Sequence, residues 1–326
     1  MYLESPTIVK VEISFGNDIL VKDYTAKLVK SLLISGNPNL KDVFARRESL
    51  PPKPIHITPL YTYSIDRSSE EKRERKVEAV YSRIVPRGSS ARPPTVDEIR
   101  PVRIEAGRRY FFYVGTNIVL LNEVLLGLSN IDGFVFGRER VLVDQLSYEI
   151  RYVDVERNSE EILETLKTAR EKRMRVVFNS PTLLKDPLVV MRRRKRKLLL
   201  PLPEAILSTP LLMVLIDKGM VRKSIFMRCM IYVKSILDIP YTALKTINLV
   251  WYVYDNEVLP AMIGYIKYFI DYQTLQYAQS VMEIKCGLDF MELLSKTTIL
   301  AQVYGVGDGR ATGFGHVTIK INKTRK

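Results

Sequence analysis

The residues best suited to bind a phosphate are five glycines near the carboxyl end of the sequence: Gly305, Gly307, Gly309, Gly313 and Gly315. A glycine can take positive φ and can approach a ligand with no β carbon in the way. In dinucleotide and P-loop sites, such a loop leaves a strand and enters a helix. Here helical spacing over residues 288–303 comes first, and strand alternation over residues 316–321 follows. This order disfavours both motifs, while an enzyme that binds a free nucleotide on the loop stays as an alternative.

Histidine is the usual general acid or base at neutral pH, and the sequence holds only two. His56 alternates with Ile55 and Ile57 in a predicted strand. His316 precedes Val317 at the start of another. Alternation predicts that both imidazoles point away from the apolar faces of their strands. Since isolated strand histidines are more often surface or supporting residues, the sequence favours catalysis by other side chains.

Two short motifs resemble those of a known protein family. The glycine loop ends in GFGHV at residues 313–317 and joins a helix to the last predicted strand. A predicted strand over residues 175–178 runs into FNSPT at residues 178–182. Both patterns resemble the RAMP superfamily of CRISPR-associated proteins, and within it the endoribonucleases that cut CRISPR repeat RNA.

The resemblance implies two tandem ferredoxin-like domains of the α+β class and a metal-independent endoribonuclease without a cofactor. Such an enzyme cleaves precursor RNA through the 2′-hydroxyl and leaves a 2′,3′-cyclic phosphate. The reaction needs in-line attack, neutralisation of charge on the pentacoordinate phosphorus and a proton for the departing 5′-oxygen. The implied partners are CRISPR repeat RNA, subunits of a CRISPR interference complex and a second copy of the chain. The alternative is a protein of the same fold that binds repeat RNA, alone or in an interference complex, without cleaving it.

Many members of this family carry a tyrosine in the first helix, a histidine just after it and a lysine at the start of the next strand. Lys53 matches the lysine, Lys30 lies near the tyrosine position, and no histidine occupies residues 45–47. The chain thereby resembles a crenarchaeal-type subset that lacks the histidine and relies on clustered lysines. The catalytic residues that this resemblance implies are Lys27, Lys30, Lys53 and Arg228.

A lysine has a pKa near 10.4, so it is charged at neutral pH and can act as an acid or as an electrostatic clamp. It can act as a base only where neighbouring cations or burial lower that pKa. The alternative for Lys27 and Lys30 is the solvent-exposed face of an amphipathic helix that begins near Asp23.

The sequence is rich in basic residues, which are suited to binding an RNA backbone. The chain has 50 Lys and Arg against 36 Asp and Glu, a net charge of +14 that favours a polyanionic partner. The predicted RNA-binding residues are Arg46, Arg47, Arg192, Arg193, Arg194, Lys195, Arg196, Lys197, Arg310, Gly313, Phe314 and Gly315. The run at residues 192–197 is the tip of a predicted hairpin, or else a solvated loop. The ring of Phe314 would stack on a base or anchor the core.

The remaining composition, with 46% hydrophobic and 26% charged residues, is typical of a folded soluble protein, and two further features predict a cytoplasmic location. Cys229 and Cys286 lie in apolar or helical runs and are predicted to be reduced core residues, too few for a disulfide framework or a zinc site. No secretion signal is predicted at the amino end. Charged residues interrupt the longest apolar region, residues 207–239, so it is not expected to span a bilayer.

The predicted elements repeat one order in the two halves of the chain. Strand, helix, strand, strand, helix and strand are predicted over residues 1–157, and the same order over residues 173–326, which add the basic hairpin and the glycine loop. Residues 158–172 are predicted to form a helix that links the two domains. Residues 66–109 are predicted to be a long loop with one embedded strand.

Overall fold

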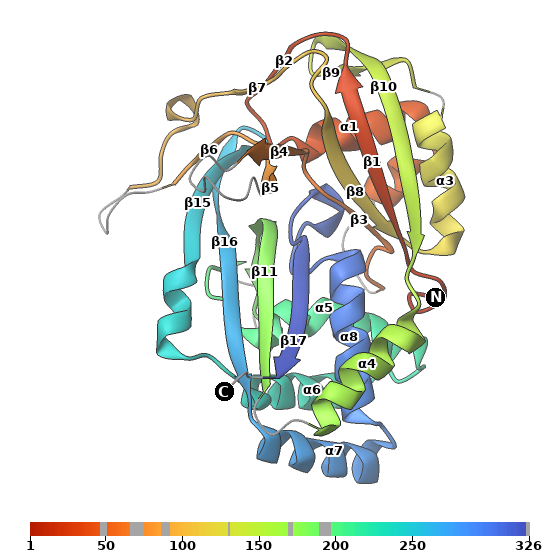
Figure 1. The fold of residues 1–326 in the computed structure, drawn as a ribbon, viewed down its shortest axis with the longest axis vertical. Helices are drawn as coiled ribbons and strands as arrows, with labels where there is room; N and C mark the ends of the chain where they lie inside the picture. Colours follow the sequence, from red (N-terminus) through yellow and green to blue (C-terminus); the bar gives the residue numbers. More distant parts are fainter. Residues whose placement is uncertain are drawn as a thin grey trace.

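The computed structural model describes residues 1–45, 51–65, 75–85, 92–129, 131–168, 172–188 and 197–323. Arg46, Arg47 and residues 192–196, all predicted to bind RNA, lie outside these ranges, and the side chain of Lys197 is not described. Two antiparallel sheets stand one above the other, each with helices packed against it (Figure 1). Within the described ranges, no helix is long and apolar enough to cross a membrane.

The upper sheet is built from the first half of the chain. Its strands run in the order β5-β4-β8-β1-β10-β9, and β3 also pairs with β8. Their bounds are β1 (Thr7–Phe15), β3 (Ile55–Ile57), β4 (Tyr61–Ile65), β5 (Arg75–Ala79), β8 (Tyr110–Thr116), β9 (Gly133–Phe136) and β10 (Glu139–Tyr152). Alternation along β1 buries Val9, Val11 and Ile13 against α1 (Ala26–Gly36) and α3 (Ile118–Ser129).

The lower sheet is built mainly from the second half of the chain. Its strands run in the order β17-β11-β16-β15-β6, and β14 also pairs with β16. Their bounds are β6 (Arg83–Ile84), β11 (Lys172–Thr182), β14 (Leu237–Asp238), β15 (Ile247–Tyr254), β16 (Glu257–Ile270) and β17 (Val317–Lys323). The helices of this half are α4 (Val155–Thr168), α5 (Pro203–Asp217), α6 (Lys223–Ile236), α7 (Tyr272–Cys286) and α8 (Phe290–Tyr304).

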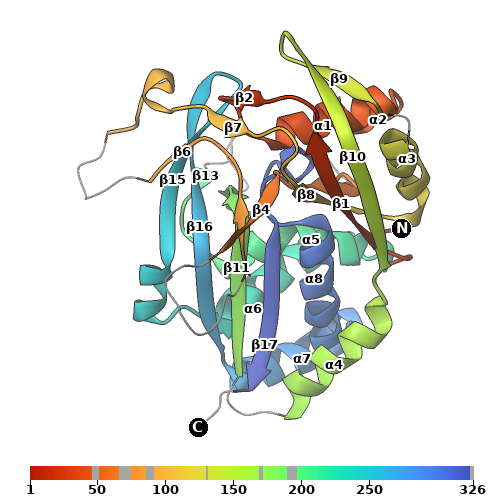
Figure 2. The same cartoon turned by 45° about the horizontal axis from the view of Figure 1, so that its top comes forward.

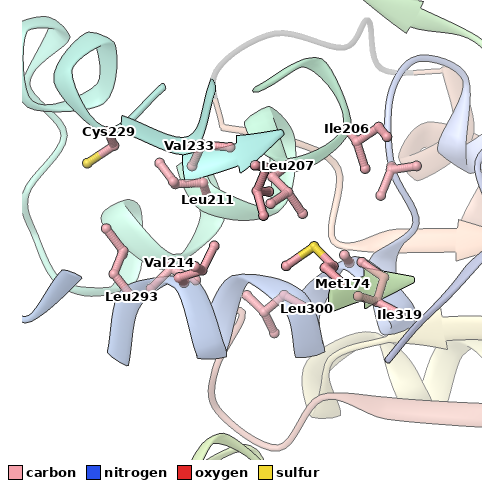
Figure 3. Close-up of a cluster of buried hydrophobic side chains, with 14 of the residues drawn as sticks. Met174, Ile206, Leu207, Leu211, Val214, Cys229, Val233, Leu293, Leu300 and Ile319 are labelled. Carbon is pink, nitrogen blue, oxygen red and sulfur yellow. The ribbon is translucent and has the colours of Figure 1, made fainter. Parts of the chain in front are cut away.

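The core of the lower half lies between this sheet and its helices. Met174 of β11 and Ile319 of β17 point toward Leu211 and Val214 of α5 and Leu300 of α8 (Figure 3). All five side chains are at most 6% exposed. Among the described residues, no helix crosses the opposite face of β11, β16 and β17 (Figure 1 and Figure 2). This face, called the open face, carries the exposed side chains of Arg175, Lys267 and Lys320.

The two sheets share one strand order, which confirms the predicted α+β fold of tandem ferredoxin-like units. In β10-β1-β8-β4 and in β17-β11-β16-β15, the fourth strand of each unit lies outside the first, and the third lies between the first and the second. One exchange departs from a simple repeat: β6 pairs with β15 through Ile84 opposite Trp251. A strand from the first half of the chain therefore completes the edge of the second sheet.

Shorter elements complete each of these two units. A small sheet joins β2 (Ile19–Val21) to β7 (Val102–Ile104), and another joins β12 (Leu184–Lys185) to β13 (Lys197–Leu198). The remaining helices are α2 (Leu40–Ala45) and the 3-10 turns η1 (Val96–Glu98), η2 (Tyr241–Thr246) and η3 (Arg310–Thr312).

Several predicted elements differ from the structure in extent. The predicted strand that contains His56 is divided into β3 and β4 around Pro59, which has no amide hydrogen to donate to a ladder. Helix α7 was not expected from the sequence. It begins where the Asp271 carboxylate accepts a hydrogen bond from the Gln273 amide, and it ends at Gly287 in the left-handed conformation.

Candidate functional site

The glycine-rich loop leaves α8 at Gly305 and reaches β17 at Val317. All five of its glycines have positive φ, as the sequence predicts. The place of each missing β carbon is occupied by the protein itself. A β carbon on Gly315 would lie 1.9 Å from the Val306 carbonyl oxygen, and one on Gly313 would lie 2.1 Å from the β carbon of Ala26. The glycines therefore serve close packing, at Gly305 and Gly313 against the first unit and at the others within the second half of the chain, and this packing does not agree with the expected open approach to a phosphate.

The backbone amides at the end of this loop already have acceptors. The Gly315 amide donates to the Pro181 carbonyl at 3.1 Å, and the Phe314 amide donates to the Gly309 carbonyl at 3.2 Å. The Gly313 amide donates within the loop as well, at 3.4 Å. The prediction that these three residues offer free amides to a phosphate does not agree with this arrangement, because two of the donors close the loop on itself and the third ties it to β11.

Arg310 and Phe314 are buried, so neither presents its side chain to a surface ligand in this structure. The guanidinium of Arg310 is fully buried and donates to the carbonyls of Tyr304, at 2.9 Å, and Lys53, at 3.4 Å. The ring of Phe314 stacks on Tyr24 with 4.7 Å between ring centres and 6° between ring planes. Of the two roles considered for Phe314, the geometry corresponds to the core anchor. The predicted contact of Arg310 with RNA stays a prediction, since its guanidinium is buried but the residue also borders a groove beside the loop.

The loop fixes the start of α1. Tyr24, just before that helix, donates from its hydroxyl to the Gly313 carbonyl at 2.9 Å. Its ring also packs on Phe314, and Ala26 lies where a side chain on Gly313 would be. Since α1 carries Lys27 and Lys30, the loop from the second unit sets the position of two of the predicted catalytic lysines.

Lys27 lies on the face of α1 that is turned toward the β15–β16 hairpin. Its ammonium forms ion pairs with Asp23, one turn earlier, and with Asp255 in the turn of that hairpin. It also lies 4.6 Å from the centre of the Tyr254 ring. Burial alone would lower the pKa of Lys27, but hydrogen bonds to the two carboxylates raise it. Lys27 therefore stays charged and ties the first unit to the second.

Lys30 lies near the same hairpin and forms no ion pair with a carboxylate of the described residues. Its Nζ atom is 5.5 Å from the centre of the Phe44 ring. Burial lowers the pKa of Lys30; attraction to Asp255 opposes this effect, and repulsion from Lys27 adds to it. Among the predicted lysines, Lys30 has the side chain best suited to give up a proton.

Lys53 is 8% exposed and donates from Nζ to the Phe44 carbonyl at 2.7 Å. Lys30 and Lys53 thus approach the same residue of α2, one over its ring and the other at its carbonyl. Arg228 does not join them: it lies in α6, in the lower half of Figure 1, and donates to the Cys286 sulfur at 3.4 Å. Arg228, predicted as a catalytic residue from the second domain, therefore lies apart from the predicted lysines.

The two histidines meet in a cleft between the sheets. Their ring centres are 5.9 Å apart. His56 is 1% exposed, and its Nδ1 donates to the Arg310 carbonyl at 2.9 Å. His316 Nδ1 lies 2.8 Å from the Tyr61 hydroxyl. His56 was predicted to point away from the apolar face of its strand, but the strand lies against the glycine loop, which buries both faces.

Burial governs the ionisation of both imidazoles. It lowers the pKa of His316 to about 4. It also lowers the pKa of His56 well below its usual value, with repulsion from His316 adding to the effect. Both histidines are therefore neutral at pH 7. The cleft that they line has a volume of about 420 Å³ and is also bordered by Lys10, Tyr113 and Arg151.

A second groove runs beside the glycine loop on its other side. It has a volume of about 670 Å³, and Pro52, adjacent to Lys53, lines it together with residues of α5 and α6. Its cations are Lys185, Arg222, Lys223 and the buried Arg310. Lys185 is paired with Asp308 at 2.7 Å, whereas Arg222 and Lys223 are exposed. These two residues are not among the predicted RNA-binding residues, although a basic pair at the start of a helix is visible in the sequence.

Comparison with known proteins adds a structural relation that the sequence alone does not show. No profile of a known protein family matches the chain, and no curated protein matches it by sequence. Solved structures do match. The Cas6 protein TTHB231 of Thermus thermophilus, solved as a product complex, has a TM-score of 0.56 at 16% identity, with 97% of this chain and 100% of that chain covered. The Cas6 protein TTHA0078, also solved as a product complex, has a TM-score of 0.51 at 11% identity, with 96% and 99% covered.

The chain has the Cas6 fold. The predicted resemblance to the repeat-RNA endoribonucleases of the RAMP superfamily is thereby confirmed at the level of fold, over nearly the whole chain. Within this Cas6 fold, the loop that carries the GFGHV motif holds α1 and β3 in place. The motif therefore indicates the fold because its residues pack against the elements of the first unit.

Proposed function

We propose that this protein is a metal-independent endoribonuclease that binds CRISPR repeat RNA and cleaves precursor transcripts into guide RNAs. The observation that carries the proposal is the position of Lys30: half-buried, with a lowered pKa, and next to the junction of α1, α2 and the β15–β16 hairpin. The Cas6 fold supports the substrate class. The net charge of +14 supports binding of a polyanion.

In the proposed reaction the 2′-oxygen attacks the adjacent phosphorus, and the bond from phosphorus to the 5′-oxygen breaks. The 2′-hydroxyl proton passes to solvent, and Lys30 gives a proton to the departing 5′-oxygen. The products are a 2′,3′-cyclic phosphate and a free 5′-hydroxyl. Lys27, held charged by Asp23 and Asp255, stabilises the extra negative charge on the phosphorus. Lys53 orients the end of α2 through its hydrogen bond to the Phe44 carbonyl.

We propose that the RNA backbone follows the groove beside the glycine loop. Arg222 and Lys223 are exposed there, and Pro52 links the groove to Lys53. In the sequence, Arg46 and Arg47 precede Pro52, and the basic residues 192–197 follow β12. All of these cations would neutralise phosphates, so binding would weaken steeply with salt, by about 0.9 log unit of affinity per log unit of salt for each phosphate contacted in a duplex.

The test is incubation of the purified protein with repeat RNA in EDTA, beside an RNA with a single 2′-deoxy substitution at the cut site. We expect cleavage of the first RNA, with a cyclic phosphate on the upstream fragment, and no cleavage of the second. Cleavage of the deoxy substrate would reject attack by the 2′-hydroxyl. Loss of activity in EDTA would reject a metal-independent reaction.

A second candidate function is binding of repeat RNA without cleavage, either alone, as a homodimer or as a subunit of an interference complex. Two observations favour it: Lys27 is neutralised by two carboxylates, and Lys53 is buried. Binding of repeat RNA with no cleavage of either substrate, at protein in excess over RNA and over long incubation, would establish this second function in place of the first.

A further inference from the structure

The open face of the lower sheet carries a row of cations. Cross-strand register places Arg175 of β11 between Lys320 of β17 and Lys267 of β16. Neighbouring strands lie about 4.8 Å apart, so the three charges occupy roughly 10 Å. All three side chains are exposed. Like charges directly opposite each other destabilise a sheet, and this arrangement therefore indicates a surface that is completed by an anion.

A second row on the same face starts with Asn322, continues through Arg173 and reaches Phe269. No Asp or Glu occurs in β11 or β17, and β16 has only Glu257 at its far end. Asp238 of β14 lies opposite Phe269 at the edge of the sheet.

Six residues of this face are called the open-face set: Arg173, Arg175, Lys267, Lys320, Tyr265 and Phe269. Within the described part of the chain, none of its four cations forms an ion pair.

Aromatic rings hold the two arginines against the sheet. The guanidinium of Arg173 lies 4.6 Å from the centre of the Phe269 ring, and that of Arg175 lies 4.5 Å from the centre of the Tyr265 ring. Lys267 approaches the same Tyr265 ring at 5.8 Å. A guanidinium held over a ring exposes a planar, charged surface, which is suited to stacking on a nucleobase. The rings thus prepare both arginines for contact with a ligand.

A hollow beside these arginines gives the surface a defined site. It has a volume of about 350 Å³ and is lined by Arg173, Tyr265, Lys267 and Phe269, with residues of the η2 segment on its far side. Pockets of this size take small organic groups. The Nε atom of Arg173 is buried and has no hydrogen-bond partner within the described residues. A ligand group in the hollow could accept from it.

We propose that the open-face set binds single-stranded RNA, with a base in the hollow, the arginines stacked on bases and Lys267 and Lys320 on phosphates. This site lies on the sheet and is separate from the groove and from the lysines of α1. The inference rests on the proposed function only for the class of ligand, RNA. An unpaired strand fits because bases within a duplex do not expose their faces for stacking, whereas every unpaired base has one.

The test uses a fluorescent uridine oligomer, which has no repeat sequence and no duplex. Lys267→Gln with Lys320→Gln removes two charges from exposed positions. We expect the slope of log affinity against log salt to fall by about 1.4, since each lost contact to a single-strand phosphate removes about 0.7. The matched control is Lys167→Gln with Lys285→Gln, two exposed lysines on α4 and α7 away from the open face. The control is expected to keep the slope of the unmodified protein.

Stacking is tested by Arg175→Lys, which keeps the positive charge but removes the planar guanidinium. Affinity for the uridine oligomer is expected to fall about fivefold to a hundredfold, as for loss of one stacked base, with little change in the salt slope. Wild-type affinity in both sets of variants, or an equal loss in the control pair, would overturn the proposal. Equal dependence on these residues for a duplex RNA or for polyglutamate would replace it with a general polyanion surface.

Cleavage is measured separately, with repeat RNA and saturating protein. If the unmodified protein cleaves but the open-face variants bind the uridine oligomer normally, the inference fails and the proposed function stands. If no cleavage occurs but the variants lose binding to the oligomer, the inference stands and the proposed function fails.

Discussion

The lysines of α1 and the histidines of the central cleft are two groups of titratable side chains that one loop holds on opposite sides. Gly313 packs on Ala26 at the lysine side, and Gly305 packs on the His56 ring at the other side. Burial lowers the pKa of Lys30 and of both histidines. Their charge states at pH 7 nevertheless differ, because lysine starts near 10.4 and histidine near 6.5.

The comparison shows how the same desolvation has opposite consequences for chemistry. A neutral histidine with a pKa of about 4 cannot supply a proton at pH 7, whereas a lysine with a lowered pKa still can, and more readily than a free lysine. The absence of a histidine at residues 45–47 therefore moves the proposed acid to Lys30. The two histidines present support the junction between the sheets.

The largest effect is expected from Lys30→Ala. Loss of a positioned acid should slow single-turnover cleavage of repeat RNA about a hundredfold to ten-thousandfold, with little change in affinity. The control is Lys41→Ala, which removes an exposed lysine from α2 and should leave the rate unchanged. A rate within a few-fold of the unmodified protein would remove Lys30 from the mechanism.

Lys30→Arg separates charge from proton transfer. Because the proposed role of Lys30 is that of an acid, the rate of cleavage should decline as pH rises through its pKa, which burial lowers below the usual lysine value. Arginine stays protonated over this range, so the variant should lose that alkaline decline. A pH–rate profile of both proteins measures this, and an identical alkaline limb in the arginine variant would assign the decline to another group.

The free energy of unfolding should depend on pH through the titration of His316. The folded pKa of His316, about 4, lies below the unfolded value near 6.5, so the unfolded state binds more protons between these values. The stabilisation is fully present above pH 6.5 and is lost as pH falls toward 4, by about 3 kcal/mol. Urea unfolding across this window measures it. In His316→Gln, which cannot titrate, the dependence should be weaker by about that amount.

The loop itself offers a matched pair of substitutions. Gly313→Ala and Gly305→Ala each place a β carbon within 2.8 Å of another residue at positive φ, and each should cost about 2–3 kcal/mol of folding free energy. Only Gly313→Ala displaces α1, so it alone should also slow cleavage under conditions where both variants are folded. Equal rates in the two variants would mean that the loop does not position the lysines.

The smallest effect is expected from Asp255→Asn, which breaks the pair between Lys27 and the hairpin. The Asp255 side chain is 69% exposed, so the loss of stability should stay below about 1 kcal/mol. Thermal unfolding measures this. A larger loss would show that the two units depend on this tether for their docking.

The sequence predicted the fold through local patterns. Alternation in β1 and β15 and the helical spacing of α1, α5 and α6 are properties of short segments, and the order of those segments was enough to indicate two ferredoxin-like units. The GFGHV motif at residues 313–317 led to the correct fold family. Helix α7 was missed, although Leu275, Ala278 and Met282 are spaced as in a helix, because its caps were not recognised.

The site was predicted less well, since its parts are distant in the sequence. Nothing near residue 56 indicates that a carbonyl 254 positions later accepts from its imidazole. The register between strands cannot be predicted from the sequence of a single strand. Lys320, Arg175 and Lys267 form a row only because three strands are aligned. The sequence therefore determined the elements, their order and the excess of positive charge, which depend on neighbouring residues and on composition. The tertiary structure alone decided which glycines pack, which lysines are desolvated and which cations meet, because these depend on contacts between segments far apart in the chain.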